Sequence, residues 1–129
     1  MNKVVTIGEI MMRLSTPGFS RFVQADSMDV VYAGSEANVA LSLSLFGLEA
    51  VHVTRFPDND LGRAATQSLE RYGVDVRHIT FGGERIGVYF LENGAMQRPS
   101  RIIYDRFNSA FANINPGHVD WDEVFTGAS

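Results

Sequence analysis

The chain has 129 residues, 45% of them hydrophobic, which is enough for one domain with a sizeable core. A formal net charge of −4 and scattered arginines argue against a general nucleic-acid-binding protein, which needs clustered basic side chains. The sequence has no cysteine, so disulfides and thiolate chemistry are excluded, and no apolar run is long enough to cross a membrane. We therefore expect a cytoplasmic protein with neither a nucleic-acid nor a membrane partner.

The N-terminal part of the chain begins with a strand-like and then a helix-like segment. The continuous apolar run at residues 4–8 predicts a buried strand, and Glu9 follows at its end, where open α/β sheets present groups to ligands. Residues 36–46 predict a helix that is apolar on nearly every side and therefore buried, ending at Gly47. The free amides of its first turn suit a small polar or anionic ligand.

The same alternation continues further along the chain. Residues 50–56 predict a second core strand, Asp60 is placed to cap a second helix that Gly73 ends, and residues 74–81 begin a third strand. Strands that alternate with helices are the signature of a parallel sheet with helical crossovers. The predicted fold class is therefore α/β.

Two segments fall outside this alternation. Residues 10–33 predict two short strands around a turn, and residues 86–107 predict a hairpin of aromatic-rich strands joined by a polar loop. Because side chains alternate along a strand, Tyr104 and Arg106 should share one face of the hairpin, and Tyr89 can join them from the partner strand. We expect these segments to form a structure at the side of the parallel sheet.

The C-terminal residues predict less regular structure. Residues 108–112 should be helical, residues 121–125 form a short amphipathic segment, and the last residues resemble a loop that leads to another strand. A sheet of so few strands is small for this pattern. We therefore expect the sequence to be a fragment of a longer protein.

Several common catalytic signatures are absent. The sequence has no phosphate-binding loop of the form G-x-x-x-x-G-K-S/T, no G-x-G-x-x-G after the first strand and no H-E-x-x-H. Asp58 and Asp60 have no third candidate ligand nearby in the sequence, so a capping and turn role is favoured over metal binding. Structural roles are also favoured for the three histidines, His52, His78 and His118. We assign no metal ligand.

The remaining motifs form a known combination. Gly8-Glu9 follows the first strand, residues 33–40 read Ala-Gly-Ser-Glu-Ala-Asn-Val-Ala, and Gly47 and the run Asp58–Gly62 come after them. In this order they resemble the N-terminal signature of the ribokinase-like (pfkB) family of carbohydrate kinases. The resemblance implies a ribokinase-like βαβ core with a small β-sheet lid over the sugar, and it places the lid strands at about 10–33 and 86–107. It also implies that residues 1–129 are the N-terminal part of one such domain, truncated before the C-terminal nucleotide-binding half.

Within the family, the lid resembles that of 2-keto-3-deoxygluconate kinases, at Gly87–Phe90, Ile103–Arg106 and Asn108–Phe111. The resemblance implies that ATP and Mg²⁺ are used to phosphorylate the terminal hydroxyl of this small acid sugar. An arginine suits its carboxylate, tyrosines offer hydroxyls, and glycine allows close backbone approach. The substrate-binding residues implied are Gly34, Asn38, Tyr89, Tyr104 and Arg106, with Glu9 and Ser35 as further candidates.

The chain departs from the family in one respect. The second family signature, a glycine-rich segment of the form Gly-x-Gly-Asp, is absent from the sequence. Its aspartate is the family's catalytic base, and amides beside it stabilise the developing negative charge. We therefore assign no catalytic residue here, expect the catalytic aspartate and most of the nucleotide site beyond residue 129, and expect a sugar-binding half-site that is inactive alone.

Two alternative functions remain. The first is a pfkB-type kinase for a neutral sugar such as fructose or ribose, or for a nucleoside. The second is a non-catalytic sugar-binding module built on half of a kinase fold. Under any of these, edge strands rich in Ile, Val, Tyr and Phe are liable to pair with another copy, so we expect a homodimer formed through the lid strands.

Overall fold

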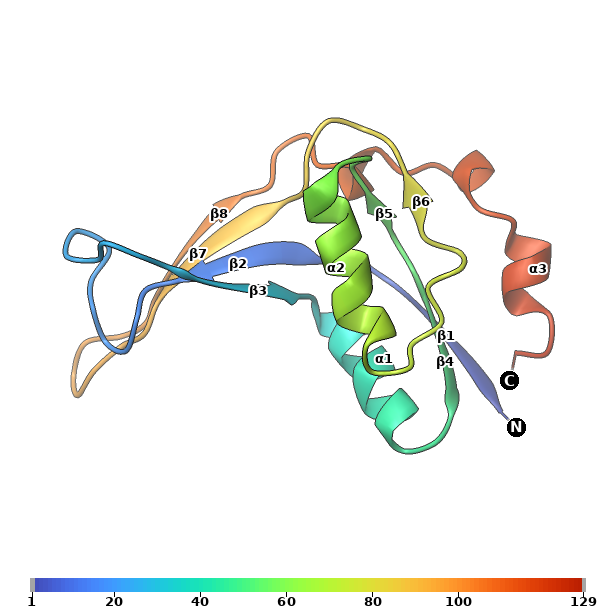
Figure 1. Ribbon diagram of the computed structural model, residues 1–129, viewed down its shortest axis with the longest axis horizontal. Coiled ribbons are helices and arrows are strands. Elements are labelled where there is room, and N and C mark those ends of the chain that lie inside the picture. Colours follow the sequence, from blue (N-terminus) through green and yellow to red (C-terminus); the bar gives the residue numbers. More distant parts are fainter. Residues whose placement is uncertain (1, 129) are drawn as a thin grey trace.

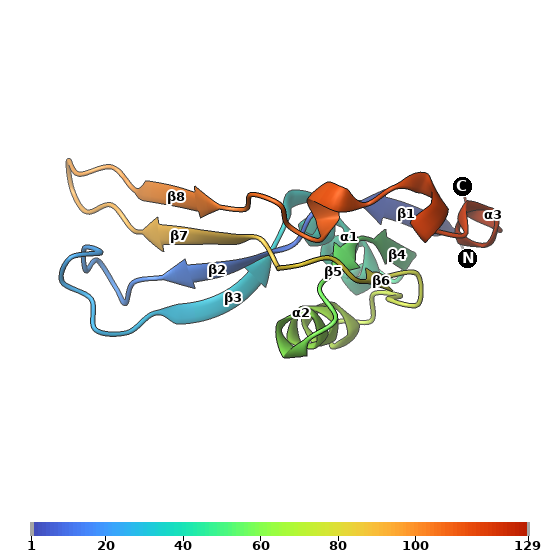
Figure 2. The same cartoon turned by 90° about the horizontal axis from the view of Figure 1, so that it is seen from above.

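A computed structural model describes residues 2–128 as a parallel core from which a four-stranded lid extends to one side (Figures 1 and 2). The core contains β1 (Lys3–Ile7), α1 (Ser35–Leu45), β4 (Glu49–Val53), β5 (Arg55–Phe56), α2 (Asp60–Glu70) and β6 (Thr80–Phe81). The lid contains β2 (Met11–Ser15), β3 (Asp29–Ala33), β7 (Val88–Glu92) and β8 (Arg101–Asp105). The last described residues form two 3₁₀ turns, η1 (Phe111–Asn113) and η2 (Pro116–His118), and the short helix α3 (Trp121–Phe125).

The core strands run parallel, as the alternating pattern predicts. β1 pairs with β4 in parallel, with Val5 opposite Val51, and β5 pairs with β6 in parallel. α1 connects the lid to β4 and α2 connects β5 to β6, so helices form the crossovers. The predicted α/β class, with a βαβ core and a separate lid, is confirmed.

The third core strand is much shorter than predicted. In place of a strand over residues 74–81, only β6 is regular, and Asp75 contributes a single bridge to Val51. The Asp75 carboxylate accepts a hydrogen bond from the backbone amide of Arg77 at 3.0 Å. Such a side-chain turn competes with the strand ladder, which explains why the strand is interrupted here.

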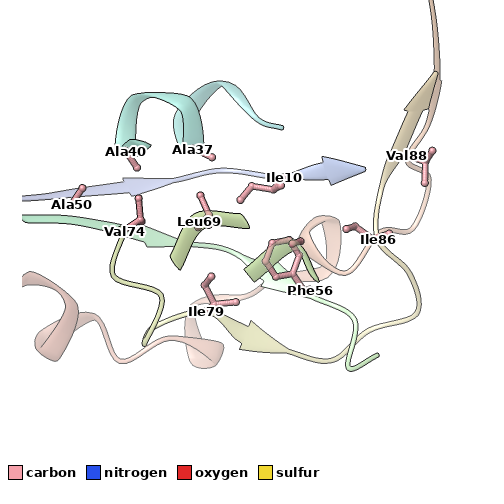
Figure 3. Packing of buried hydrophobic residues seen from close by; sticks show 11 residues of the cluster. Ile10, Ala37, Ala40, Ala50, Phe56, Leu69, Val74, Ile79, Ile86 and Val88 are labelled. Atoms are coloured by element: carbon pink, nitrogen blue, oxygen red, sulfur yellow. The ribbon is translucent and has the colours of Figure 1, made fainter. Parts of the chain in front are cut away.

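Each face of β4 packs against a different layer. Ala50 belongs to the larger apolar cluster, together with Ala37 and Ala40 of α1 and Leu69 of α2. Figure 3 shows this cluster continuing through Phe56 toward Ile86 and Val88 at the lid end. On the other face of β4, Val51 and Val53 pack in a second cluster with Val119 and Val124 of the C-terminal segment. Strand alternation thus places the helical layer on one side of the core and α3 on the other.

The prediction that the first helix is buried is wrong for the described residues. Only Ala37 and Ala40 of α1 are buried, because the helix packs on the core through a narrow face of small side chains. Large apolar side chains on its other faces, including Val39 and Leu45, are exposed, and Phe46 directly after it is 81% exposed. The apolar composition of the helix therefore exceeds what these residues bury.

The lid is a mixed sheet with the strand order β3-β2-β7-β8. β2 and β3 form one antiparallel pair and β7 and β8 form another, which confirms the two pairs predicted at residues 10–33 and 86–107. The pairs join through parallel β2 and β7, with Arg13 opposite Tyr89. Figure 2 shows the four strands side by side, extending from the core as one sheet.

The C-terminal segment differs in part from its prediction. Residues 108–112 do not form a helix, because Asn108 adopts a left-handed conformation with φ of 55°, and only the 3₁₀ turn η1 follows. The amphipathic segment 121–125 is helix α3. At the end of the described chain, Ala128 forms a parallel bridge with Lys3 of β1. No helix of the described residues is long and apolar enough to cross a membrane.

The cap of α2 lies one residue before the predicted position. The side chain of Asn59, in extended backbone conformation, accepts a hydrogen bond from the amide of Gly62 at 3.1 Å, so Asn59 is the N-cap. Asp60, the predicted cap, is instead the first helical residue, and its exposed carboxylate pairs with Arg63. Asn and Asp are both good N-cap residues, so the sequence alone allows either Asn59 or Asp60, and the extended backbone of Asn59 identifies it as the cap.

The cap assignment predicts different effects for two neighbouring alanine substitutions. Asn59→Ala removes the cap and should lower the free energy of unfolding by about 1 kcal/mol. Asp60→Ala removes only an exposed ion pair and should change it by less than about 0.5 kcal/mol. Urea denaturation of both variants measures the difference, and a larger loss for Asp60→Ala would contradict the assignment.

Candidate functional site

The chain crosses between core and lid four times, and these crossings form a narrow neck. The first crossing links β1 to β2 and contains Glu9, and the second links β3 to α1 at Gly34. The third reaches β7 through Gly87, and the fourth leaves β8 at Arg106. All four lie at the carboxyl end of β1, the edge of a parallel sheet where ligands bind in open α/β folds.

Glu9 contacts each of the other three crossings. Its Oε1 forms an ion pair with the guanidinium of Arg106, and its side chain is only 7% exposed. A methyl group on Gly34 would overlap its carbonyl oxygen, and one on Gly87 would lie 2.6 Å from its Oε2. Oε2 is buried and has no hydrogen-bond partner among the described residues. Glycine at position 34 is thus required by the close approach of the Glu9 backbone, whereas a side chain at position 87 would displace the Glu9 carboxylate.

One pocket of about 240 Å³ lies between the inner face of the lid and the start of α1. Gly34, Ser35 and Asn38 line it from the α1 side, and Tyr89 and Tyr104 line it from the lid. The tyrosine rings are 5.8 Å apart between centroids and tilted by 36°. The remaining lining residues are Met11, Arg13, Ala33 and Ile102. We call this the tyrosine pocket.

A second pocket of about 350 Å³ adjoins the tyrosine pocket at Met11, Gly34 and Ser35. Glu9 and Arg106 line it, and we call it the neck pocket. A larger cavity of about 600 Å³ lies between β3, α1 and α2 and shares Arg13 and Asn38 with the tyrosine pocket. The first residues of α1 and the residues just before it therefore line three neighbouring pockets that share lining residues.

The predicted site residues divide between the two pockets near the neck. Gly34, Ser35, Asn38, Tyr89 and Tyr104 come together in the tyrosine pocket, as expected for a single site. Arg106 and Glu9 lie instead in the neck pocket, paired with each other. β8 ends at Asp105, so Arg106 is not in the same strand as Tyr104. Gly34 and Ser35 line both pockets.

His52 supports the neck from inside the core. It is fully buried, and its Nε2 donates a hydrogen bond to the Gly8 carbonyl at 3.2 Å. That carbonyl can only accept, so Nε2 carries the proton and Nδ1 accepts from the hydroxyl of Thr6 at 2.7 Å. Burial lowers the pKa of His52 to about 4, so the neutral ring is the form that holds the residue before Glu9.

Two common signatures of metal and nucleotide sites are absent from the described residues. Among residues 2–128 no group of three or more His, Cys, Asp or Glu side chains could hold a metal ion. The helix start at Gly34 has no side-chain cap, and it lacks the lysine and the glycine run of a phosphate loop. Two carboxylates line the neck pocket beside it, Glu36 and Glu9, and Glu9 is already paired with Arg106. We therefore derive no step through ATP or Mg²⁺ from these residues.

Comparison with known families decides what this arrangement belongs to. Residues 1–128 match the family described as pfkB family carbohydrate kinase. The chain is a member of the pfkB family. A putative ribokinase II from E. coli shares the fold of this pfkB chain, with a TM-score of 0.85 at 22% identity, over 99% of this chain and 42% of that one.

More similar relatives of the pfkB chain have names that concern acid sugars. A 2-dehydro-3-deoxygalactonokinase of Haloferax volcanii is 36% identical over 127 residues, covering 98% of this chain and 40% of the relative. A 2-dehydro-3-deoxygluconokinase of Thermoproteus tenax is 34% identical over 124 residues, which are 93% of this chain and 38% of the relative. The solved 2-dehydro-3-deoxygluconokinase of Thermotoga maritima has a TM-score of 0.97 at 51% identity, and the match covers 99% of this chain and 39% of that one. The chain thus spans about 40% of the length of these relatives.

Sequence reasoning did not single out two residues near the site of this pfkB chain. His52 looked like an ordinary strand residue, because its partners Thr6 and Gly8 are set by the pairing of β1 with β4. Arg13 lines the tyrosine pocket but lies in a segment predicted only as a short strand. Strand alternation could have placed Arg13 on one face, but only the pairing of β2 with β7 puts it beside Tyr89.

The buried His52 predicts a loss of stability in mild acid. Its folded pKa of about 4 lies below its ordinary value of 6.5, so the unfolded chain takes up the proton first as pH falls. The free energy of unfolding should therefore decrease between pH 6.5 and 4, by about 3 kcal/mol from this group.

Denaturant titrations of wild type and His52→Gln across this pH range measure that contribution. Glutamine can still donate to Gly8 but does not titrate, so the variant should be less stable than wild type near neutral pH and should lose less stability on acidification. Identical pH slopes for the two proteins would show that His52 does not carry this dependence.

Proposed function

We propose that the complete protein containing this chain is a kinase that transfers the ATP γ-phosphate to the terminal hydroxyl of 2-keto-3-deoxygluconate. This sugar is the 2-dehydro-3-deoxygluconate of the relatives' names. The observation that carries the proposal is the tyrosine pocket, in which backbone and amide groups of α1 face two tyrosines and an arginine of the lid. Its mixed lining of apolar walls and a few polar groups suits a small acid sugar.

Each side of the pocket has a distinct role in this proposal. Gly34 lets the sugar approach the backbone, and the amide of Asn38 offers a donor and an acceptor to sugar hydroxyls. Tyr89 and Tyr104 provide hydroxyls and an apolar wall on the opposite side. Ser35 lines both pockets, and Arg106 lines the adjoining neck pocket, from which it supplies a positive charge for the carboxylate. Glu9 holds Arg106 in place.

We further propose that the phosphate-transfer machinery lies in the part of the relatives' length that this chain does not span. The family resemblance implies a catalytic aspartate beyond residue 129, which would take the proton from the sugar hydroxyl, and a site for ATP and Mg²⁺ near it. Residues 1–129 then form the N-terminal part of one ribokinase-like domain, in the cytoplasm where ATP is available. Residues 1–129 alone should bind sugar without turning it over.

A coupled turnover assay with ATP and Mg²⁺ tests the proposal. The complete protein should phosphorylate 2-keto-3-deoxygluconate more efficiently than its galactonate epimer, fructose, ribose or a nucleoside. Arg106→Ala should lower kcat/KM at least about tenfold for the acid sugar, and far less for an analogue with hydroxymethyl in place of the carboxylate, because only the acid sugar loses a charged partner.

Each other outcome favours a named alternative. Equal losses for the acid sugar and its analogue in Arg106→Ala would favour a neutral-sugar or nucleoside kinase. Sugar binding without turnover by the complete protein would favour a non-catalytic sugar-binding module. Enzyme-dependent product from residues 1–129 alone would contradict the proposal that this part is inactive.

We also propose that two copies associate through their lids. β3 and β8 are the edge strands of the lid sheet, and apolar residues from all four strands form a row across its outer face, namely Val30, Leu14, Phe90 and Ile103. Val30 is 54% and Ile103 is 48% exposed at the two edges. A second copy can pair with such an edge and cover this row.

Light scattering measures the association. The complete wild-type protein should have the mass of a dimer, and Ile103→Lys should shift it toward the monomer, because a charge in the apolar contact is costly. Val23→Lys is the matched control, since Val23 is exposed in a loop between β2 and β3 and should leave the mass unchanged. A wild-type monomer at high concentration would rule out the dimer.

A further inference from the structure

We propose that Arg13 is a specificity-determining residue of this kinase, and that its guanidinium binds the carboxylate of the acid sugar in the tyrosine pocket. The inference rests on the proposed function and adds to it a residue of β2, outside the segments that carry the family resemblance. It depends on three observations: the register of the lid sheet, the burial of an unpartnered donor, and the partner that Arg106 already has.

The register places Arg13 in the same row as the two tyrosines. Arg13 of β2 is directly opposite Tyr89 of β7, and Tyr89 is directly opposite Tyr104 of β8. Residues opposite each other on neighbouring strands project from the same face of a sheet. The three side chains therefore lie side by side on the face that covers the start of α1, and all three line the tyrosine pocket together with Asn38.

The guanidinium of Arg13 has an unsatisfied donor at this position. Its Nε is buried and has no hydrogen-bond partner among the described residues. A buried donor on a charged group is costly unless an acceptor of opposite charge reaches it. Because Nε is covered, the two Nη groups are the ones that can meet a ligand, and they can donate two parallel hydrogen bonds to a carboxylate, whereas a neutral sugar hydroxyl leaves the charge unpaired.

The other arginine at the site differs in both place and partner. Arg106 lies in the neck pocket and its positive charge is balanced by Glu9, which is nearly buried beside it. Arg13 forms none of the ion pairs found among residues 2–128. Of the two guanidinium groups, Arg13 is therefore the one without a carboxylate partner among residues 2–128, and it can add a second charged contact to the one proposed for Arg106.

Kinetics of Arg13 variants of the complete protein test the inference. Arg13→Met should raise KM for 2-keto-3-deoxygluconate about tenfold to a hundredfold with little change in kcat, because a ground-state contact to a charged group is lost. KM for the analogue with hydroxymethyl in place of the carboxylate should change less than about threefold. Arg13→Lys, which keeps a point charge but not the planar fork, should fall between wild type and Arg13→Met on the acid sugar.

A second arginine of the lid provides the matched control. Arg101 of β8 is exposed and, by strand alternation, lies on the face opposite Tyr104, so Arg101→Met should leave KM for both sugars unchanged. Thermal unfolding of each variant reports its folding. If Arg13→Met does not fold, Arg13→Lys decides, because a loss confined to the acid sugar still identifies the carboxylate contact.

The outcomes separate this inference from the proposed function. If wild type phosphorylates the acid sugar but Arg13→Met is unaffected, or loses both sugars equally, the role of Arg13 is overturned and the proposed function stands. If wild type shows no preference for the acid sugar over its analogue, the proposed substrate is wrong and the inference fails with it.

Discussion

The contacts of Glu9 are the constraint on which the site depends. A single residue at the end of β1 pairs through its side chain with Arg106 and packs through backbone and side chain against Gly34 and Gly87. These residues belong to the other three segments that join core and lid. Glu9 therefore contacts both the lid and the start of α1, and His52 hydrogen-bonds the carbonyl of the residue before it. Gly34 of the tyrosine pocket and Arg106 of the neck pocket are thus both in contact with Glu9.

Charge is distributed unequally between the two pockets that meet at Gly34. The neck pocket contains a paired carboxylate and guanidinium, while the tyrosine pocket contains the unpaired guanidinium of Arg13. In the low dielectric of a partly closed site, an unpaired charge discriminates strongly between an anion and a neutral ligand. Arg106 therefore has both a structural partner, Glu9, and its proposed substrate contact, whereas Arg13 has no ion-pair partner among residues 2–128.

Features local to one segment could be predicted from the sequence, and features set by pairing could not. The βα alternation, the two lid pairs and the cluster of Gly34 and Asn38 follow from apolar periodicity and from a contiguous motif. The contacts of Arg13 and His52 depend on register between strands distant in the chain, which no periodicity reports. The shortening of the third strand has another cause, because Asp75 forms a turn within an otherwise strand-like sequence. The exposure of α1 was also not predictable from its apolar composition, because only the face with Ala37 and Ala40 packs on the core.

The four chain crossings limit how this lid can move. A flap attached by one hairpin can rotate about two hinge residues, but a sheet attached by four segments can rotate only if backbone angles change in all four together. At two of those segments a glycine lies so close to Glu9 that an added methyl group would overlap it. Closure over a ligand would therefore move the whole sheet, with the change in backbone angles shared among the four crossings.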